Sequence, residues 1–315
     1  MNSTIEVYAE SALGDYGFGD NHPFGNDRLG AFKREFIARG LDQLVALPPS
    51  RLATSEELLR FHTQDYLKRA QSLSKIGFGY LDLGDTPARL GIFDAAARVV
   101  GTALEAAESL MSSDTRRCFL PIGGLHHGRR DSAGGFCVLN DCGVVIETLK
   151  QQYGLDRIAY VDIDAHHGDG VFYEFEDDPS LLVADIHEDG RFLYPGTGMS
   201  EETGRGRALG LKLNIPMLPE SDEAAFLNEW PRVLEHVAQF SPEFIMLQAG
   251  ADSVVGDPLT HLEFTPACHR HACRTLCDLA DSLSSPLMIM GGGGYNLHNI
   301  AQTWCGIVEE LLIDL

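Results

Sequence analysis

The chain has 315 residues, and 44% of them are hydrophobic, so it is long enough to bury a substantial core. Its 46 acidic residues outnumber its 24 lysine and arginine residues, which gives a formal net charge of −22. This charge disfavours direct binding of nucleic acid or of anionic membranes and favours a cationic substrate or a basic protein segment, although it also serves solubility.

Short apolar runs bounded by glycine, proline, aspartate or asparagine predict buried strands. In chain order these runs cover residues 5–9, 118–124, 157–164, 181–187, 211–217, 244–250 and 286–294. Segments with helical spacing lie between several of them, at residues 93–111, 142–153, 224–240 and 268–283. The alternation predicts an α/β fold with a parallel sheet and crossover helices. No repeat or long linker divides the chain, so we expect one domain over residues 1–315.

The apolar runs, the N-terminal residues and the cysteines together predict a cytoplasmic protein. No uncharged apolar run reaches the length of about 18 residues that suggests a membrane helix, and no basic region followed by a long apolar stretch opens the chain. The seven cysteines contain no CxxC pair, and we interpret them as reduced thiols. Oligomeric state is not indicated by the sequence.

Polar clusters follow five of the predicted strands directly. They are GGLHHG, DAHHGDG, DIHEDG, QAGADS and GGGGYN. Ligands bind at the carboxyl edge of an open parallel sheet, so five such endings on one edge would form a site.

The segment YVDIDAHHGDG indicates a metal site. Asp162 and Asp164 lie two apart on a strand and face the same side, and a turn at the next residue brings His166 beside them. A third protein ligand is needed to hold zinc with one position left for water, and Asp252 of QAGADS is the best candidate. The alternative is that the aspartates cap helices and the histidines lie in a surface loop.

Acid–base chemistry is indicated by His126 and His127, which follow another strand. They could be further metal ligands, but two imidazoles beside a metal site suit proton transfer when carboxylates orient them, and Asp162 and Asp169 are available for that. Tyr295 follows four glycines and could donate to an oxyanion. The alternatives are structural histidines bonded to carboxylates and a core tyrosine beside a glycine-rich turn.

Together these residues resemble the zinc-dependent histone deacetylase family, including its bacterial deacetylase-like and acetylpolyamine amidohydrolase branches. The resemblance covers nearly the whole chain. It rests on NHPFGNDRL, FHTQDYL, DTPARLGIFDAAA, GGLHHGRRDSAGGFCVLND, YVDIDAHHGDGV, LYPGTG, LQAGADSVVGDPL and GGGGYNLHNIAQTW, in this order.

The resemblance implies a three-layer, arginase-like α/β fold with a central, mostly parallel sheet of about eight strands. It implies one catalytic Zn²⁺, or Fe²⁺ as the alternative, held by Asp164, His166 and Asp252. The tandem histidines would be the acid–base catalysts, backed by the two other aspartates, and the tyrosine would polarise the substrate carbonyl. The implied reaction is hydrolysis of an N-acylated amine to a short acid and a free amine.

The resemblance also implies a set of substrate-binding residues and a second ion. Asp85 would bind the substrate at the rim, and Arg28 would lie behind the metal. A narrow tunnel would be lined by Gly135, Phe136 and Tyr194, the last standing where phenylalanine is frequent. Structural potassium in the family implies K⁺ ligands at Asp162, Asp164, His166 and Asp185, but Asp185 stands where serine is expected.

The sequence leaves alternatives for the substrate and for the activity. The resemblance places Leu259 at a position that is leucine or methionine in lysine deacetylases and glutamate in a polyamine-selective branch. An apolar residue there favours acetyl-lysine over acetylpolyamines or other small acylated amines. Binuclear manganese ureohydrolases share the fold, but Gly168 and Val254 stand where carboxylates for a second metal are needed. An inactive module that binds acylated amines is the third alternative.

Overall fold

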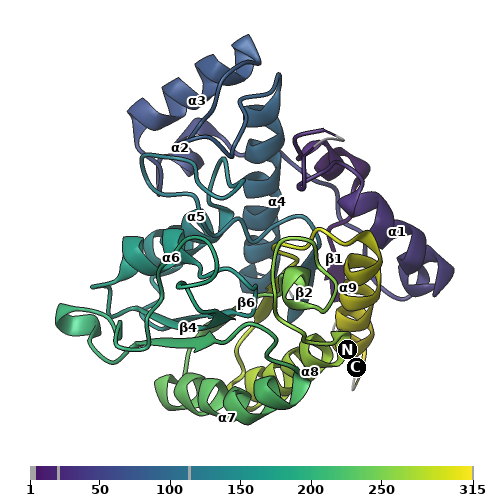
Figure 1. Ribbon diagram of the computed structural model, residues 1–315, viewed down its shortest axis with the longest axis vertical. Coiled ribbons are helices and arrows are strands. Elements are labelled where there is room, and N and C mark those ends of the chain that lie inside the picture. The colour runs from purple at the N-terminus through teal and green to yellow at the C-terminus, as the bar shows by residue number, and fades with distance from the viewer. Residues whose placement is uncertain (1–4, 20–21, 113–114, 314–315) are drawn as a thin grey trace.

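One parallel sheet organises the computed structural model, which describes residues 5–19, 22–112 and 115–313 (Figure 1). Its strands, in chain order, are β1 (Ile5–Val7), β2 (Arg117–Leu120), β3 (Ile158–Asp162), β4 (Leu181–Glu188), β5 (Lys212–Met217), β6 (Phe244–Gln248) and β7 (Leu287–Met290). Each predicted apolar run forms one of them. The described residues therefore give seven strands, all parallel, where the resemblance implied about eight. The first four residues and Asn21, which contributed to the N-terminal predictions, lie outside the described ranges.

Helices cover both faces of this sheet. The longer ones are α1 (Arg28–Ala38), α3 (Gln64–Ile76), α4 (Ile92–Ser112), α5 (Asp141–Tyr153), α7 (Glu223–Phe240), α8 (Pro266–Leu283) and α9 (Leu297–Leu311). Single turns of helix are α2 (Ser55–Leu58) and α6 (Asp169–Phe172), and 3₁₀ turns lie at Ser11–Asp15, Leu41–Gln43, Tyr173–Phe175, Gly206–Ala208 and Ala251–Ser253. The four predicted helices are confirmed.

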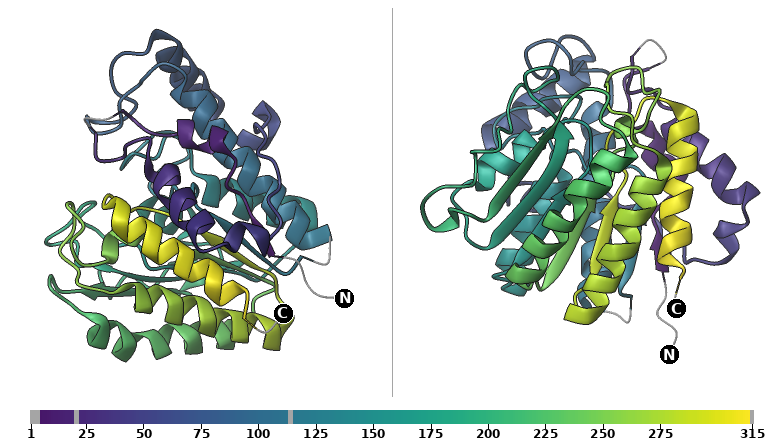
Figure 2. Two further views of the ribbon diagram at one scale, coloured as in Figure 1. Left: turned by 90° about the vertical axis from the view of Figure 1, so that its right-hand side faces the viewer. Right: turned by 60° about the horizontal axis from the view of Figure 1, so that its bottom comes forward.

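The layers explain why the strands read as continuous apolar runs. Helices α7, α8, α9 and α1 pack side by side over one face, and α4 with α5 covers the other (Figure 2). All residues of β2, β3, β4, β6 and β7 are buried. A strand that is covered on both faces has no solvent side, so it lacks polar alternation. No helix among the described residues combines the length and apolar character needed to cross a membrane.

The order of the strands places the five polar endings next to one another. The order is β1-β2-β7-β6-β3-β4-β5, so the strands that precede the polar clusters form one continuous block of the sheet. Within that block Asp162, the last residue of β3, is the register partner of both Asp185 on β4 and Gln248 on β6. The predicted convergence on one carboxyl edge is confirmed.

Candidate active site

Asp164, His166 and Asp252 converge behind the ends of β3 and β6. The Nδ1 atom of His166 lies 3.1 Å from Oδ1 of Asp164 and 3.1 Å from Oδ2 of Asp252. All three side chains are buried, and one ligand atom from each lies within 4.8 Å of the others. They form the one cluster of this kind among the residues that the structure describes.

Glycines make room for this cluster. A Cβ atom on Gly250 would lie 2.1 Å from Oδ2 of Asp164, and one on Gly293 would lie 2.1 Å from Oδ2 of Asp252. The N–H of Gly293 also donates to Oδ2 of Asp164 at 2.8 Å. The glycine run after β7 therefore brings its backbone against the carboxylates, and a larger residue at either position would displace them.

Two buried carboxylates and an imidazole fit a divalent metal ion. Carboxylate oxygen and imidazole nitrogen are ligands of Zn²⁺ and of Fe²⁺, and three protein ligands leave a position open for a reacting molecule. Without a cation, two carboxylates this close and this deeply buried would repel each other at a high electrostatic cost. The donor set and its burial therefore fit the predicted metal site.

The tandem histidines are paired with separate carboxylates. Nδ1 of His126 lies 2.8 Å from Oδ2 of Asp162, and Nδ1 of His127 lies 2.7 Å from Oδ1 of Asp169. The two Nε2 atoms are 3.1 Å apart. Both pairings match the sequence prediction and leave the Nε2 edges of the rings facing the same space.

The two imidazoles differ in proton affinity. Burial alone lowers the pKa of both rings, but the charges of Asp162 and Asp164 outweigh it at His126 and raise its pKa to about 9. At His127 burial is reinforced by the neighbouring charge of His126, and the pKa falls to about 4. Two rings in contact cannot both be charged cheaply, and these directions favour a neutral His127 beside His126.

Tyr295 reaches the same space from the loop after β7. It lines an inner cavity of about 10 Å³ together with both histidines and with Asp164 and His166. Burial, then the charges of Asp252 and Asp164, hold the pKa of the phenol well above its usual value. Its hydroxyl therefore keeps its proton and can donate it in a hydrogen bond.

Of the expected tunnel residues, Gly135 lines this inner cavity, Tyr194 lines a wider mouth, and Phe136 packs against Tyr295. The Phe136 ring centre is 5.9 Å from that of Tyr295, and the Tyr194 ring centre is 5.1 Å from that of His127. Gly135 has φ 50°, and a Cβ there would lie 2.3 Å from Cδ2 of His127, so only glycine fits.

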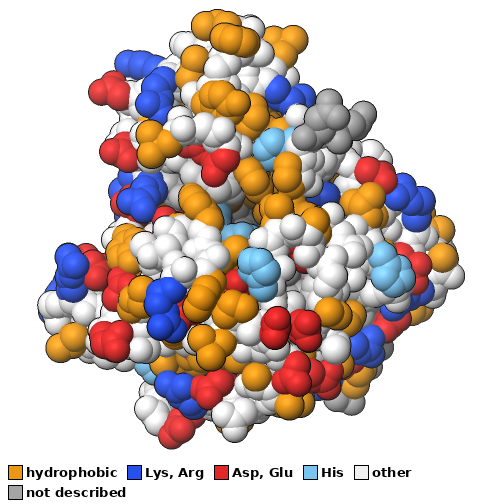
Figure 3. Space-filling view, in the orientation of Figure 1, with side chains coloured by type: hydrophobic (Ala, Val, Ile, Leu, Met, Phe, Trp, Pro, Cys, Tyr) orange, Lys and Arg blue, Asp and Glu red, His pale blue; other side chains and the backbone are white. Residues whose placement is uncertain are grey.

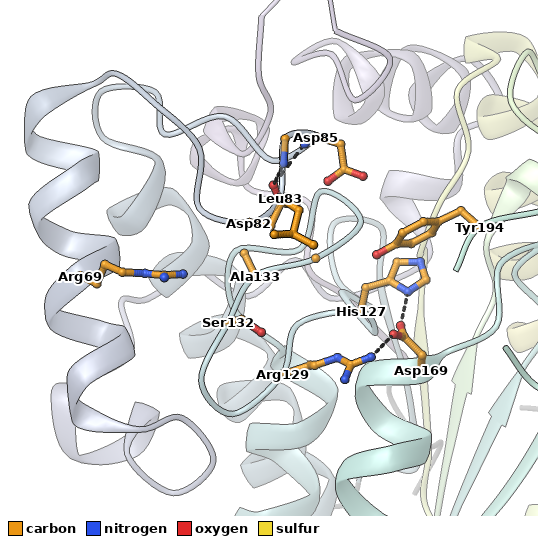
Figure 4. Close-up of a pocket in the computed structure, with 12 residues that line it drawn as sticks. Arg69, Asp82, Leu83, Asp85, His127, Arg129, Ser132, Ala133, Asp169 and Tyr194 are labelled. Atoms are coloured by element: carbon orange, nitrogen blue, oxygen red, sulfur yellow. Dashed lines mark hydrogen bonds and ion pairs between the residues drawn. The ribbon is translucent and has the colours of Figure 1, made fainter. Parts of the chain in front are cut away.

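The mouth is a cavity of about 810 Å³ between α3 and the loop that carries Tyr194 (Figure 4). Asp85, Leu83 and Asp82 line one side of it, and His127 with Asp169 lies at its inner end. Leu259 is half-buried and is not among the residues that line either cavity. The structure thus brings Asp85 to the mouth as expected, but not Leu259.

The predicted potassium ligands fit a cation less well than the Asp164–His166–Asp252 cluster does. Oδ1 of Asp185 lies 2.7 Å from Nδ1 of His187, and its Oδ2 accepts the N–H of Gly168 at 2.9 Å. The Nε2 atom of His187 lies 2.9 Å from the carbonyl oxygen of Gly198, so both nitrogens of this buried ring face acceptors. This arrangement favours an imidazolium, which itself places a positive charge beside Asp185.

Several supporting residues were missed by sequence reasoning. Gln248 donates to Oδ2 of Asp164 at 2.8 Å, and Arg129 donates to Oδ2 of Asp169 at 2.9 Å. Asp141 accepts the N–H groups of Gly124 and Leu125 and so shapes the turn before the tandem histidines. Gln248 could have been found, because it is a polar residue at the end of an apolar strand and is the first residue of QAGADS.

Arg28, which the resemblance placed behind the metal, lies against the glycine loop. It is 2% exposed, and its Nε and Nη2 atoms donate to the carbonyl oxygens of Gly294 and Gly292 at 2.8 Å and 2.6 Å. Its guanidinium also lies 4.0 Å from the centre of the Phe24 ring. Arg28 therefore fixes the backbone that leads to Tyr295.

Comparisons with known proteins agree with this geometry. Residues 22–311 match the family model "Histone deacetylase domain". The chain is 36% identical over 325 residues to "Acetoin utilization protein AcuC" of Bacillus subtilis, covering 99% of this chain and 82% of that protein. It is 34% identical over 283 residues to "Histone deacetylase 8" of Xenopus tropicalis, covering 85% and 73% of the two chains. The crystal structure of the HDA15 HD domain superposes with a TM-score of 0.90 at 28% identity, covering 99% of this chain and 90% of that one. A family match over nearly the whole chain, with the same fold, shows that this chain belongs to the histone deacetylase family.

Proposed function

We propose that the protein is a metal-dependent deacetylase that releases acetate from acetyl-lysine in a polypeptide. One observation carries the proposal: Asp164 and His166 of the metal cluster line the same inner cavity as the two carboxylate-paired histidines and the Tyr295 phenol. A metal site, proton-transfer groups and an oxyanion donor are the parts that amide hydrolysis needs.

Asp164, His166 and Asp252 would hold the ion, which we propose to be Zn²⁺ with Fe²⁺ as the alternative. When bound, it would act as a Lewis acid toward the amide carbonyl and lower the pKa of a water molecule. The hydrogen bonds from Gln248 and Gly293 to Asp164 orient that carboxylate from outside the ligand set.

The chain's own residues would move the protons. His127, the neutral ring of the pair, would accept a proton from the attacking water at Nε2 while Asp169 holds the Nδ1 proton in place. One of the tandem histidines would then give a proton to the departing amine. Tyr295 would donate a hydrogen bond to the oxygen that becomes negatively charged as the carbonyl is attacked.

Cavity sizes support a short acyl group on a large substrate. The inner cavity of about 10 Å³ has room for roughly one water molecule, so it leaves no space for a long acyl chain. The mouth, at about 810 Å³, is far wider than one alkyl chain needs. Asp85 stands at that mouth, where it would accept hydrogen bonds from the substrate.

A small acetylated polyamine is the second candidate. The carboxylates of Asp82 and Asp85 lie at the mouth, and a negative rim attracts a cationic amine as well as a basic polypeptide. The other two alternatives have less support. Gly168 and Val254 leave a second metal without carboxylates, and every proposed member of the catalytic set is present, which disfavours an inactive module.

We further propose that residues 1–315 act as one catalytic domain in the cytoplasm. The continuous sheet supports the first point. Seven free, buried cysteines support a reducing compartment. Potassium is not part of the proposal, because His187, with both ring nitrogens facing acceptors, already places a positive charge beside Asp185.

Acetate release by the zinc-loaded protein tests the function. Three matched panels would be compared: acetyl-lysine peptides, monoacetylated polyamines and small acetylated amines, each with a chelator-treated control. We expect chelator-sensitive turnover that is fastest on the peptides. Faster turnover of the polyamines would identify an acetylpolyamine, in place of acetyl-lysine, as the substrate. If protein with bound metal released no acetate from any panel, the proposed function would be contradicted.

A further inference from the structure

The end of α3 and the loop that follows it expose an unusual run of apolar side chains. Ile76 is 68% exposed, Phe78 82%, Tyr80 55%, Leu83 109% and Leu90 69%. We call these five side chains the apolar rim. In the space-filling view hydrophobic side chains gather at the upper end of the molecule, over α3 and the loop beside it (Figure 3).

One member of the apolar rim lies at the mouth of the active site. Leu83 lines the cavity of about 810 Å³ that also contains Asp85 and His127 (Figure 4). At the other end of the rim, Leu90 lines a second hollow of about 380 Å³ with Lys75 and Phe93. The rim therefore has one member at the catalytic mouth and another at a second concave surface.

The rim is presented by a loop with many fixed contacts. Oδ1 of Asp82 accepts the N–H groups of Gly84, Asp85 and Thr86 at 3.0, 3.1 and 3.0 Å. The hydroxyl of Thr86 in turn accepts the N–H of Phe136 at 3.1 Å, which ties the loop to the tunnel wall.

The same loop also buries an apolar side chain. Leu81 lies in the same loop and is fully buried, and its carbonyl oxygen accepts a hydrogen bond from Arg69 at 2.7 Å. Leu83 is therefore held outward by a chain that is anchored on both sides of it. Several large apolar side chains that one short segment keeps in water mark a candidate binding surface.

We propose that the apolar rim binds the part of a polypeptide substrate that flanks the acetylated lysine, and that it selects substrates with apolar or aromatic residues there. This inference rests on the proposed function. The occupant follows from these positions: a single amine chain in the tunnel would leave Phe78 and Leu90 uncovered, whereas a polypeptide lying across the mouth would meet Leu83 and then the rest of the rim. Aromatic and aliphatic side chains are suited to such contacts because their burial removes apolar surface from water, which is favourable.

The test compares Phe78→Ser and Leu90→Ser with Leu209→Ser. Leu209 is a matched control, because it is 69% exposed like Leu90 but lies between a 3₁₀ turn and β5. The substrates are an acetyl-lysine peptide with leucine and phenylalanine flanks, the same peptide with glycine and serine flanks, and monoacetylated 1,5-diaminopentane. We expect each rim variant to raise KM about fivefold to tenfold for the apolar-flanked peptide alone, with kcat unchanged. The control should match the wild type on all substrates.

Three results would overturn the proposal. One is equal KM values for the two peptides with the wild-type protein. Another is an equal loss on all three substrates, which would mean that the loop supports the site rather than binding the flanks. The third is a wild-type dimer, seen by sedimentation, that Phe78→Ser dissociates, because the rim would then be an interface between copies.

Binding measured by fluorescence anisotropy separates this proposal from the proposed function. The same two peptides, labelled with a fluorophore, would be titrated with the wild type and with both rim variants. Weaker binding of the apolar-flanked peptide to the variants, without acetate release by any form, would support the rim and contradict the deacetylase. Acetate release, together with identical dissociation constants for all forms, would support the deacetylase and contradict the role of the rim.

Discussion

The Nδ1 atom of His127 lies 2.7 Å from Oδ1 of Asp169, and both side chains are 5% exposed. The other oxygen of Asp169 accepts a hydrogen bond from Arg129 at 2.9 Å, so the carboxylate is fixed on two sides. This geometry holds a proton on Nδ1 and leaves Nε2 free to accept one. Asp169→Asn should therefore lower kcat by roughly 10²–10⁴-fold, the range for loss of general acid–base catalysis. Exposed Asp177→Asn is the control, and a variant at position 169 with near-normal kcat would contradict the role.

Removal of the Tyr295 hydroxyl tests oxyanion stabilisation. Tyr295→Phe keeps the ring that packs 5.9 Å from Phe136 and 6.3 Å from Phe24, so the tunnel wall should be preserved. We expect kcat to fall roughly 10²–10³-fold, the effect of losing one oxyanion donor, with KM little changed. Metal content would be measured in the same samples. Full turnover by a variant with normal metal content would remove Tyr295 from the mechanism.

Metal removal should lower stability as well as activity. A metal ion at Asp164, His166 and Asp252 would neutralise buried carboxylates and bind only the folded protein. At free Zn²⁺ 100 times above its dissociation constant, the free energy of unfolding should rise by about 2.7 kcal/mol. Urea unfolding with and without the metal measures this. Asp252→Asn should abolish the increase, and an unchanged wild-type unfolding curve would count against the site.

Sequence reasoning located the chemistry because that chemistry lies at strand ends. Asp164 and His166 directly follow β3, and the apolar run of β6 leads to Asp252, so a parallel sheet was enough to bring them together. Arg129 could not be assigned in the same way. Its contact with Asp169 joins a loop to α6, and no spacing in the sequence specifies that pairing.

The apolar rim was also beyond sequence reasoning. Leu81 and Leu83 lie two residues apart in a loop without regular periodicity, yet one is fully buried and the other fully exposed. Hydrophobicity alone predicts the same environment for both. The difference comes from the hydrogen bonds of Asp82, between them, which set the path of the chain.

Substrate affinity should depend on pH through Asp85. Burial and the nearby carboxylate of Asp82 raise the pKa of Asp85 to about 7, so its carboxyl is neutral below that pH and ionised above it. An ionised carboxylate accepts hydrogen bonds more strongly. We expect KM for an acetyl-lysine peptide to fall about tenfold as the pH rises from 6 to 8. Asp85→Asn should keep a high KM at both pH values, while exposed Asp65→Asn behaves as the wild type. A wild-type KM that rises with pH would contradict the assignment.

Acid stability should be limited by His62, which lies away from the metal cluster. Its Nε2 accepts the N–H of Asn140 at 3.0 Å, so the proton is on Nδ1, which lies 3.0 Å from the carbonyl oxygen of Arg129. Burial of this neutral ring lowers its pKa from 6.5 to about 4. Above pH 6.5 neither the folded nor the unfolded state holds the extra proton, and the full stability is present.

As the pH falls from 6.5 to 4, the unfolded state takes up a proton that folded His62 cannot accept, so stability is lost. We expect this one group to remove roughly 2–3 kcal/mol from the free energy of unfolding over that range. His62→Gln keeps a donor and an acceptor but does not titrate, so it should be less stable at pH 7 and lose less on acidification. Urea unfolding of both proteins at pH 7 and pH 4.5 measures the difference. Equal losses in the two proteins would show that another group sets the acid limit.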